Sequence, residues 1–243
     1  MIAKLLFILS KGKVFNGIVG FIFQYFSSML PVKKVYNSKN IIGFFHPKPS
    51  YTCHILLVPK RRISNFLALC SSENYSLFIE IIKAAKLTLK SVNNLDDKFI
   101  LCINGGLRQE VKQAHFHMYK DTSEYLKRLK EIEYVDLYSE KNLNIKYYND
   151  VRNVIFTIII PPCFNDNAEN RDSNNIIKNM LGIIYNIVNI LRLESTGYTI
   201  VYNCESSLHM PHKDQFYIVT DYYNIGKNWN SKFNLKLSDL LKS

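Results

Sequence analysis

The stretch Gln113-Ala114-His115-Phe116-His117 places two histidines two residues apart within a segment, Val111–Tyr119, that we predict to be a β-strand. Side chains on a strand alternate between its two faces, so Gln113, His115 and His117 are expected to share one face. The residues between them are expected to enter a core. Two histidines that point the same way from one strand lie about 7 Å apart at Cα, which is close enough to act on one phosphoryl group.

This arrangement suits nucleophilic phosphate chemistry. A neutral imidazole attacks phosphorus and forms a covalent phosphohistidine, while a second imidazole stabilises charge on the phosphoryl oxygens. The unobstructed amides of Gly105 and Gly106 are placed to help bind those oxygens. Two other interpretations stay open at this point: a metal site with His54 as the third ligand, and histidines with a structural role only.

The order of expected elements repeats along the chain. The first half contains expected strands at 41–45, 54–58, 99–103 and 111–119, with a helix at 74–92. The second half contains expected strands at 154–160, 199–202 and 216–220, with a helix at 174–192. Pro59 and Pro161 follow corresponding strands, and so do Asn104 and Asn203, at offsets of about 100 residues in both cases. We therefore predict a duplicated α+β unit.

Two blocks of sequence resemble the histidine-triad family. The first is Phe45-His46-Pro47-Lys48-Pro49 followed by His54-Ile55-Leu56-Leu57-Val58-Pro59-Lys60, and the second runs from Asn104-Gly105-Gly106 through Gln109 to His117. The resemblance implies an α+β histidine-triad-like fold, an antiparallel sheet with packed helices, in two halves that form an intrachain pseudo-dimer. We expect a basic apolar segment at 1–35, a domain with the motif at 36–145 and a degenerate domain at 146–243.

The resemblance also implies roles for individual residues. His115 matches the nucleophile, His117 matches a phosphate ligand, and His54 matches a histidine that supports them. Gln113 is expected to hold phosphate oxygens together with His117. Asn104 and Gln109 match polar residues near the phosphate. The implied activity is hydrolysis or transfer at the α-phosphate of a nucleotide or other phosphorylated small molecule, without a cofactor or metal.

The chain departs from the family pattern at three places. Gln113 stands where the first triad histidine is expected, and an amide cannot shuttle a proton. His46 stands where many members have an Asp that holds the ribose hydroxyls. When the second half is aligned from Asn203 without gaps, or shifted by one residue, neither register places a histidine at the nucleophile position, so that half is expected to be catalytically empty although it contains His209 and His212. These departures favour a rival hypothesis, in which the protein is a catalytically inactive scaffold subunit of a larger assembly. Under this hypothesis a mitochondrial assembly is one of the alternatives.

The charge distribution limits the classes of partner that we expect, and the cysteine content limits the expected compartment. No Asp or Glu precedes Glu73, whereas ten Lys and Arg do, so the net charge of +11 belongs to one end of the chain. That end is a candidate contact for RNA, an anionic membrane or a protein partner. Its apolar runs are too short to span a bilayer. Five scattered cysteines without a CxxC pair favour a reducing intracellular compartment, cytoplasmic or mitochondrial.

Overall fold

The computed structural model describes residues 21–25, 30–51, 53–92, 99–120, 125–140, 143–149, 153–160, 171–203 and 214–221. The chain forms two compact units. Most of the expected N-terminal segment at 1–35, and the second-half residues His209 and His212, lie outside the described residues. No helix among the described residues is long and apolar enough to cross a bilayer.

The first unit is built on a five-stranded antiparallel sheet. Its strands lie in the order β1-β2-β3-β5-β4. They are β1 (Lys34–Asn37), β2 (Ile41–Phe45), β3 (Ile55–Pro59), β4 (Phe99–Gly105) and β5 (Phe116–Lys120). The helices assigned to this unit are α3 (Phe66–Leu69), α4 (Tyr75–Val92) and α5 (Tyr125–Glu131).

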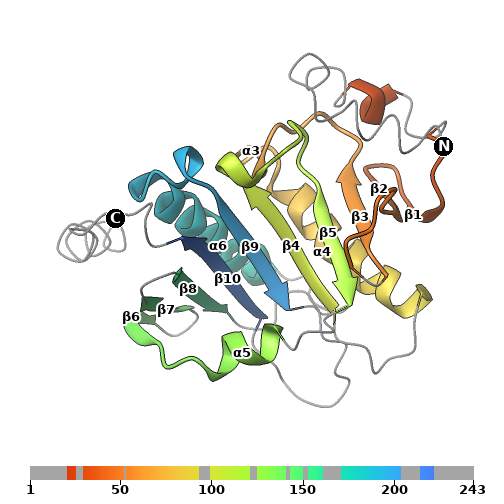
Figure 1. The fold of residues 1–243 in the computed structure, drawn as a ribbon. Coiled ribbons are helices and arrows are strands. Elements are labelled where there is room, and N and C mark those ends of the chain that lie inside the picture. Colours follow the sequence, from red (N-terminus) through yellow and green to blue (C-terminus); the bar gives the residue numbers. More distant parts are fainter. Residues whose placement is uncertain are drawn as a thin grey trace. The chain divides into compact units, whose positions relative to one another are not determined.

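The second unit repeats this plan. Its strands lie in the order β6-β7-β8-β10-β9, with α6 (Arg171–Ile190) packed on β8. They are β6 (Val135–Glu140), β7 (Leu143–Asn149), β8 (Asn153–Ile160), β9 (Tyr198–Asn203) and β10 (Asp214–Asp221). In both units three strands precede the long helix, two follow it, and the last two strands exchange places in the sheet (Figure 1). The predicted duplication is confirmed at the level of element order, while the expected boundary between residues 145 and 146 stays a prediction.

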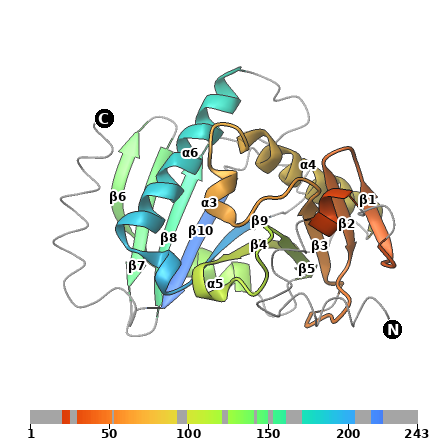
Figure 2. The ribbon, with the colours of Figure 1, turned by 90° about the horizontal axis from the view of Figure 1, so that it is seen from above.

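The long helix of each unit covers one face of that unit's sheet (Figure 2). In α4 the apolar side chains recur at helical spacing, and Leu77, Ile81, Ala85 and Leu89 are buried. Phe78 of the same helix packs its ring 6.1–6.2 Å from the rings of Phe66 and Phe116. Because Phe116 points toward α4, its neighbour His117 points to the opposite face of the sheet.

The N-terminal residues that are described pack on the first unit. Phe23, in the helical residues 21–25, lies against the cluster that contains Ile42 and Phe44. Its ring is 6.1 Å from that of Phe44 with an interplanar angle of 17°. These contacts hold the helical residues 21–25 against β2 of the first unit.

Strand β5 is shorter than expected, because residues 111–115 bend away from the strand geometry. The prediction of a strand over 111–119 is therefore wrong in its first half. Instead of lying on an open strand face, Gln113 is 1% exposed. The bend is held by backbone bonds, among them one from the Ala114 amide to the Ile63 carbonyl at 2.6 Å.

Two side-chain amides join this bend to the loop after β3. The Gln113 amide nitrogen donates to the carbonyls of Pro59 and Arg61, both at 3.0 Å, and its oxygen accepts from the Ile63 amide at 3.3 Å. The Gln109 amide nitrogen donates to the carbonyls of Ser64 and Val111, both at 2.7 Å. Both hydrogens of each amide are therefore used on the backbone.

We predict that Gln113→Leu destabilises the protein although leucine is of similar size. The substitution removes the partner of the buried Pro59 carbonyl, of the part-buried Arg61 carbonyl and of the buried Ile63 amide, and each buried group left unpaired costs roughly 1–3 kcal/mol. Urea unfolding of the full chain should show a loss of roughly 2–4 kcal/mol in the free energy of unfolding. The exposed amide of Gln24 supplies the matched control, since Gln24→Leu should change stability by no more than about 0.5 kcal/mol. A Gln113→Leu protein as stable as the wild type would contradict this account.

Candidate functional site

Strand register brings three histidines to one face of the first sheet. Phe45 pairs with Ile55 across β2 and β3, so His46 and His54 lie opposite each other just beyond that pair. The His46 amide donates to the His54 carbonyl at 2.8 Å, which continues the ladder. His54 lies two residues before Leu56, and Leu56 pairs with His117 of β5. Because directly paired residues share a face, the three imidazoles project on the same side, away from α4.

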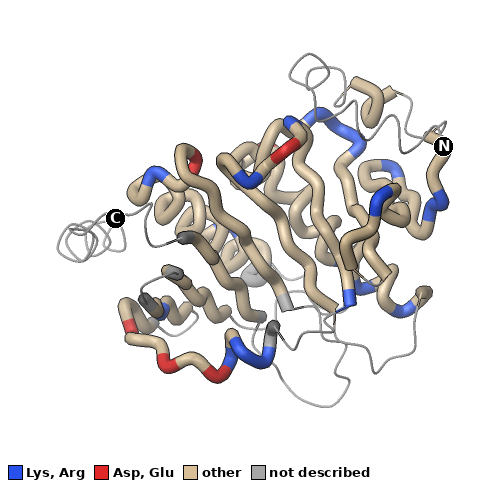
Figure 3. Tube along the Cα trace, in the orientation of Figure 1, with Lys and Arg blue, Asp and Glu red and all other residues tan. Residues whose placement is uncertain are grey.

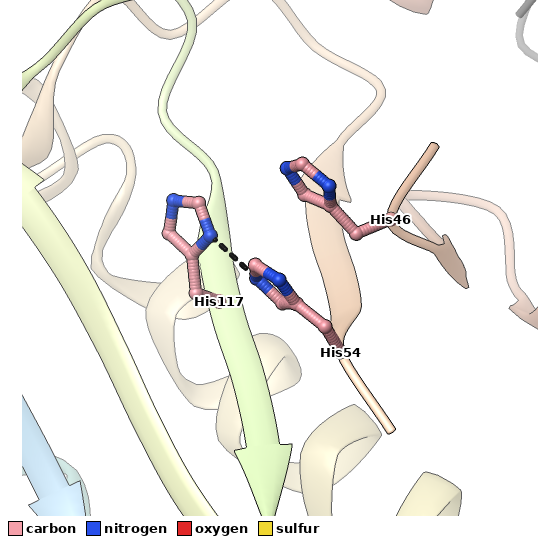
Figure 4. Close-up of side chains that lie close together, drawn as sticks. All are labelled: His46, His54 and His117. Carbon is pink, nitrogen blue, oxygen red and sulfur yellow. Dashed lines mark hydrogen bonds between the residues drawn. The ribbon is translucent and has the colours of Figure 1, made fainter. Parts of the chain in front are cut away.

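The rings lie close together (Figure 4). Those of His46 and His54 are stacked with centroids 4.2 Å apart and planes 9° apart. The centroid of His117 is 5.2 Å from that of His54 and 6.0 Å from that of His46. His115, just before β5, places its ring 4.9 Å from that of His117 in an edge-to-face arrangement. Four imidazoles therefore form one cluster.

Hydrogen bonds to the backbone fix which nitrogen of His54 and His117 carries hydrogen. The Ser50 amide can only donate, and it lies 3.4 Å from Nδ1 of His54, so that nitrogen accepts. Neutral His54 then carries its hydrogen on Nε2, which lies 2.9 Å from Nδ1 of His117 and donates to it. His117 in turn carries hydrogen on Nε2. The chain of bonds thus makes Nε2 of His117 a hydrogen-bond donor.

The opposite tautomer is set at His115. Its Nδ1 lies 2.7 Å from the Gln113 carbonyl, which can only accept, so Nδ1 carries the hydrogen. The lone pair of neutral His115 is therefore on Nε2. An electron-pair donor at His115 and a hydrogen-bond donor at His117 stand side by side on adjoining rings.

Burial lowers the pKa of three of these imidazoles, those of His54, His115 and His117. The pKa of His54 falls to about 4, mainly because burial disfavours the charged form and then because His46 and His115 repel a second positive charge. The pKa of His117 falls to about 2, again chiefly through burial, with His115, His54 and His46 adding repulsion. Burial also lowers the pKa of His115, opposed by its bond to the Gln113 carbonyl and by the charge of Glu110. At neutral pH the lone pair on His115 is thus available.

Two tyrosines border the cluster. The ring of Tyr51, which is 51% exposed, stacks on that of Tyr119 with centroids 4.0 Å apart and planes 12° apart. Both rings meet His54 edge-on, at 5.4 and 5.8 Å. This aromatic pair contributes to the burial of His54 on that side.

A metal ion is a less good match for the same residues. One nitrogen each of His46, His54 and His117 lies within 4.8 Å of the other two. However, Nδ1 of His46 accepts from the Lys48 amide at 3.1 Å and Nδ1 of His54 accepts from Ser50, so the remaining nitrogens of both rings carry hydrogen. Metal ligation needs a lone pair on those nitrogens, which would place an N–H against each backbone amide.

The residues of the Asn-Gly-Gly segment pack within the second unit. The Asn104 side-chain oxygen accepts from the Thr199 hydroxyl at 2.8 Å. Gly105 lies against the ring of Tyr198, where a Cβ would clash, and Gly106 has φ +58° beside the carbonyls of Leu193 and Glu194. Packing and backbone conformation account for both glycines, and their expected contribution to a phosphate site stays a prediction, as do those of Asn104 and Gln109.

The position of His46 beside His54 is not predicted by the local sequence pattern. The pairing of β2 with β3 as a hairpin would predict it. When the two strands pair in register, the residue just after β2 lies opposite the residue just before β3. In the second unit, β10 corresponds to β5 by its place in the sheet, and it contains no histidine. His115 lies just before β5, and the corresponding residues just before β10 lie outside the described residues, so the expected lack of a nucleophile in the second half stays a prediction.

Comparisons with known proteins place the first unit in a family. Residues 28–122 match the model of the HIT domain. An uncharacterized HIT-like protein from Methanocaldococcus jannaschii is 30% identical over 114 residues, which are 44% of this chain and 84% of that protein.

One of two solved structures described here matches less than half of this chain, and the other matches most of it. A histidine triad protein from Clostridium difficile matches at 21% identity over 42% of this chain and 90% of its own, with a TM-score of 0.37. An ADP-glucose phosphorylase from Arabidopsis thaliana, solved with bound ADP-glucose, matches at 8% identity over 83% of this chain and 80% of its own, with a TM-score of 0.48. On the sequence match to the archaeal relative and the HIT-domain model, the chain belongs to the histidine-triad family.

Proposed function

We propose that the protein is a nucleotide hydrolase or nucleotidyltransferase that works through a covalent intermediate on His115. The observation that carries the proposal is the pair of opposite tautomers at His115 and His117. A lone pair that faces a substrate beside an N–H donor is what nucleophilic attack on a phosphoryl group requires. Membership in the histidine-triad family supports a nucleotide as the phosphorylated substrate.

The first step forms one bond and breaks one. Nε2 of His115 attacks phosphorus, and the N–P bond forms as the bond from phosphorus to the leaving group breaks. The electron pair of that bond departs with the leaving group. Nε2–H of His117 donates to a phosphoryl oxygen and stabilises the charge that develops there. The Gln113 carbonyl accepts the bond from Nδ1–H of His115 and stabilises the positive charge on the substituted ring.

The second step returns the histidine to its starting state. Water, or another acceptor in a transfer reaction, attacks the same phosphorus and gives its proton to solvent. The N–P bond breaks and its electron pair returns to Nε2 of His115. His54 acts as a positioning residue, because its bond to Nδ1 of His117 holds that ring in the donor tautomer.

The proposed reaction assigns no proton to Gln113. Both of its amide hydrogens bond backbone carbonyls, and an amide does not ionise at neutral pH. The role expected for Gln113 as a ligand of phosphate oxygens is therefore not part of the proposal. Its carbonyl orients His115, and its side chain fixes the loop after β3.

We predict that His115→Ala abolishes both the covalent adduct and turnover. The full chain is mixed with a dinucleoside polyphosphate, quenched after one turnover and weighed by intact-mass spectrometry. The wild type should gain the mass of one nucleotidyl group, and His115→Ala should gain none while its steady-state rate falls by roughly 10⁴-fold. His209→Ala removes a histidine outside the motif and should keep the adduct. Turnover by His115→Ala at the wild-type rate, with unchanged thermal stability, would refute the proposal.

We also predict a strong dependence of rate on the leaving group. Because no residue of the proposed site donates a proton to the departing atom, groups that leave readily as anions should react far faster than basic ones. Single-turnover rates for the adenosine 5′-(4-nitrophenyl phosphate) ester should exceed those for the unsubstituted phenyl ester by roughly 10²-fold, the smaller end of what a general acid contributes. Equal rates for the two esters would show that a proton donor acts at this site.

A further inference from the structure

Tyr51 lies beside the proposed site without a part in the reaction above. It belongs to the loop between β2 and β3, and it is 51% exposed. His54 follows three residues later and is only 4% exposed. The ring of Tyr51 meets the ring of His54 at 5.4 Å, with 67° between the two planes. A half-exposed side chain therefore lies directly against a buried histidine of the site.

Tyr119 gives Tyr51 a fixed surface to stack on. It lies in β5 two residues after His117, so both side chains are on the same face of the sheet. The side chain of Tyr119 shares a hydrogen bond with Cys102 of β4, and Cys102 pairs with His117 across the strands. Tyr51 stacks on the Tyr119 ring at 4.0 Å, and Tyr119 meets His54 at 5.8 Å. The stack thus holds the loop tyrosine in place beside the histidine.

The other contacts of His54 involve residues on its remaining sides. His46 stacks on its ring at 4.2 Å, and His117 accepts the hydrogen bond from its Nε2 at 2.9 Å. Of the rings of His46, His117, Tyr51 and Tyr119, that of Tyr51 belongs to the most exposed residue. Loss of the Tyr51 ring would therefore open His54 to water.

Burial is the largest cause of the low pKa of His54. That pKa is about 4 instead of 6.5, and repulsion from His46 and His115 adds to the effect of burial. No Asp or Glu occurs in the five strands of the first sheet (Figure 3). Glu110, in the segment before β5, acts on His115 and raises its pKa. Removal of the Tyr51 ring would change the burial of His54 and leave these titratable groups in place.

We propose that Tyr51 is a positioning residue for the reaction at His115, because its ring excludes water from His54 and preserves the neutral form that orients His117. This inference rests on the proposed function. Protonation would add a hydrogen to Nδ1 of His54, which accepts from the Ser50 amide. Two donors cannot bond each other, so the ring would lose the contact that fixes it. It would then also lose the position from which Nε2 donates to His117.

The first test is the titration of His54 in the full chain, followed by NMR on histidine-labelled protein without a substrate. Tyr51→Ala should raise the pKa of His54 from about 4 toward 6.5, because water then solvates the charged ring. Tyr51→Phe keeps the ring and should keep the low pKa. Tyr185→Ala is the matched control, since Tyr185 is 44% exposed but belongs to α6 of the second unit. It should leave the titration of His54 unchanged.

The second test is the pH dependence of adduct formation. With a pKa of 6.5, about a tenth of His54 is neutral at pH 5.5, so Tyr51→Ala should react roughly tenfold more slowly than the wild type at that pH. At pH 8 the two proteins should react at the same rate, which also shows that the variant is folded. Tyr51→Phe should follow the wild type at both pH values.

Three results would overturn the proposal. They are a pKa of His54 that stays near 4 in Tyr51→Ala, an equal rise of that pKa in Tyr185→Ala, and a rate of Tyr51→Ala that falls equally at both pH values. The titration needs no substrate. If the wild type forms no adduct, the proposed reaction fails, and the titration of His54 still decides whether Tyr51 keeps that histidine neutral.

Discussion

The hydrogen bond between Nε2 of His54 and Nδ1 of His117 is the interaction on which the candidate site depends. It joins the residue before β3 to a residue within β5, and the two strands that carry them are paired in register. Because His54 is itself fixed by the Ser50 amide, the bond leaves His117 one tautomer in its neutral form. The pairing of β3 with β5 thereby gives the proposed phosphate site a hydrogen-bond donor in a defined tautomer.

The rest of the first unit keeps this bond in place. Phe116 and Met118 of β5 are buried on the face that α4 covers, so His117 between them is directed to the other face. Gln113 ties the bend before β5 to the loop after β3, and its carbonyl holds His115 in the opposite tautomer. Gln113, the residue that departs from the family motif, thus supports His115, the proposed nucleophile, through its backbone carbonyl.

Much of this arrangement follows from the sequence. The limits of β2 and the helix α4 agree with expectation to within a residue, since their apolar patterns and the turns that bound them are strong. The repeated order of elements was also predictable from matching landmarks. Strand periodicity placed His115 and His117 on one side, although it extended the strand too far and counted Gln113 with them.

The remaining features depend on contacts that no local pattern encodes. The bend at 111–115 arises because buried amides find partners in a loop about 50 residues earlier. His46 joins the cluster through hairpin register, and its tautomer is set by one backbone amide in a proline-rich turn. Gly105 and Gly106 have the composition of a phosphate loop. The space that a Cβ would fill at Gly105 is occupied by Tyr198, and at Gly106 by the backbone of Leu193 and Glu194.

The most direct test of the central claim is the tautomeric state of the site histidines, measured by long-range ¹H–¹⁵N correlation NMR on histidine-labelled protein at pH 7. Nitrogen shifts distinguish imidazolium from either neutral tautomer, and single substitutions assign each ring. The account predicts neutral rings, with hydrogen on Nδ1 in His115 and on Nε2 in both His54 and His117. Hydrogen on Nε2 of His115, or an imidazolium at His54 or His117, would contradict it.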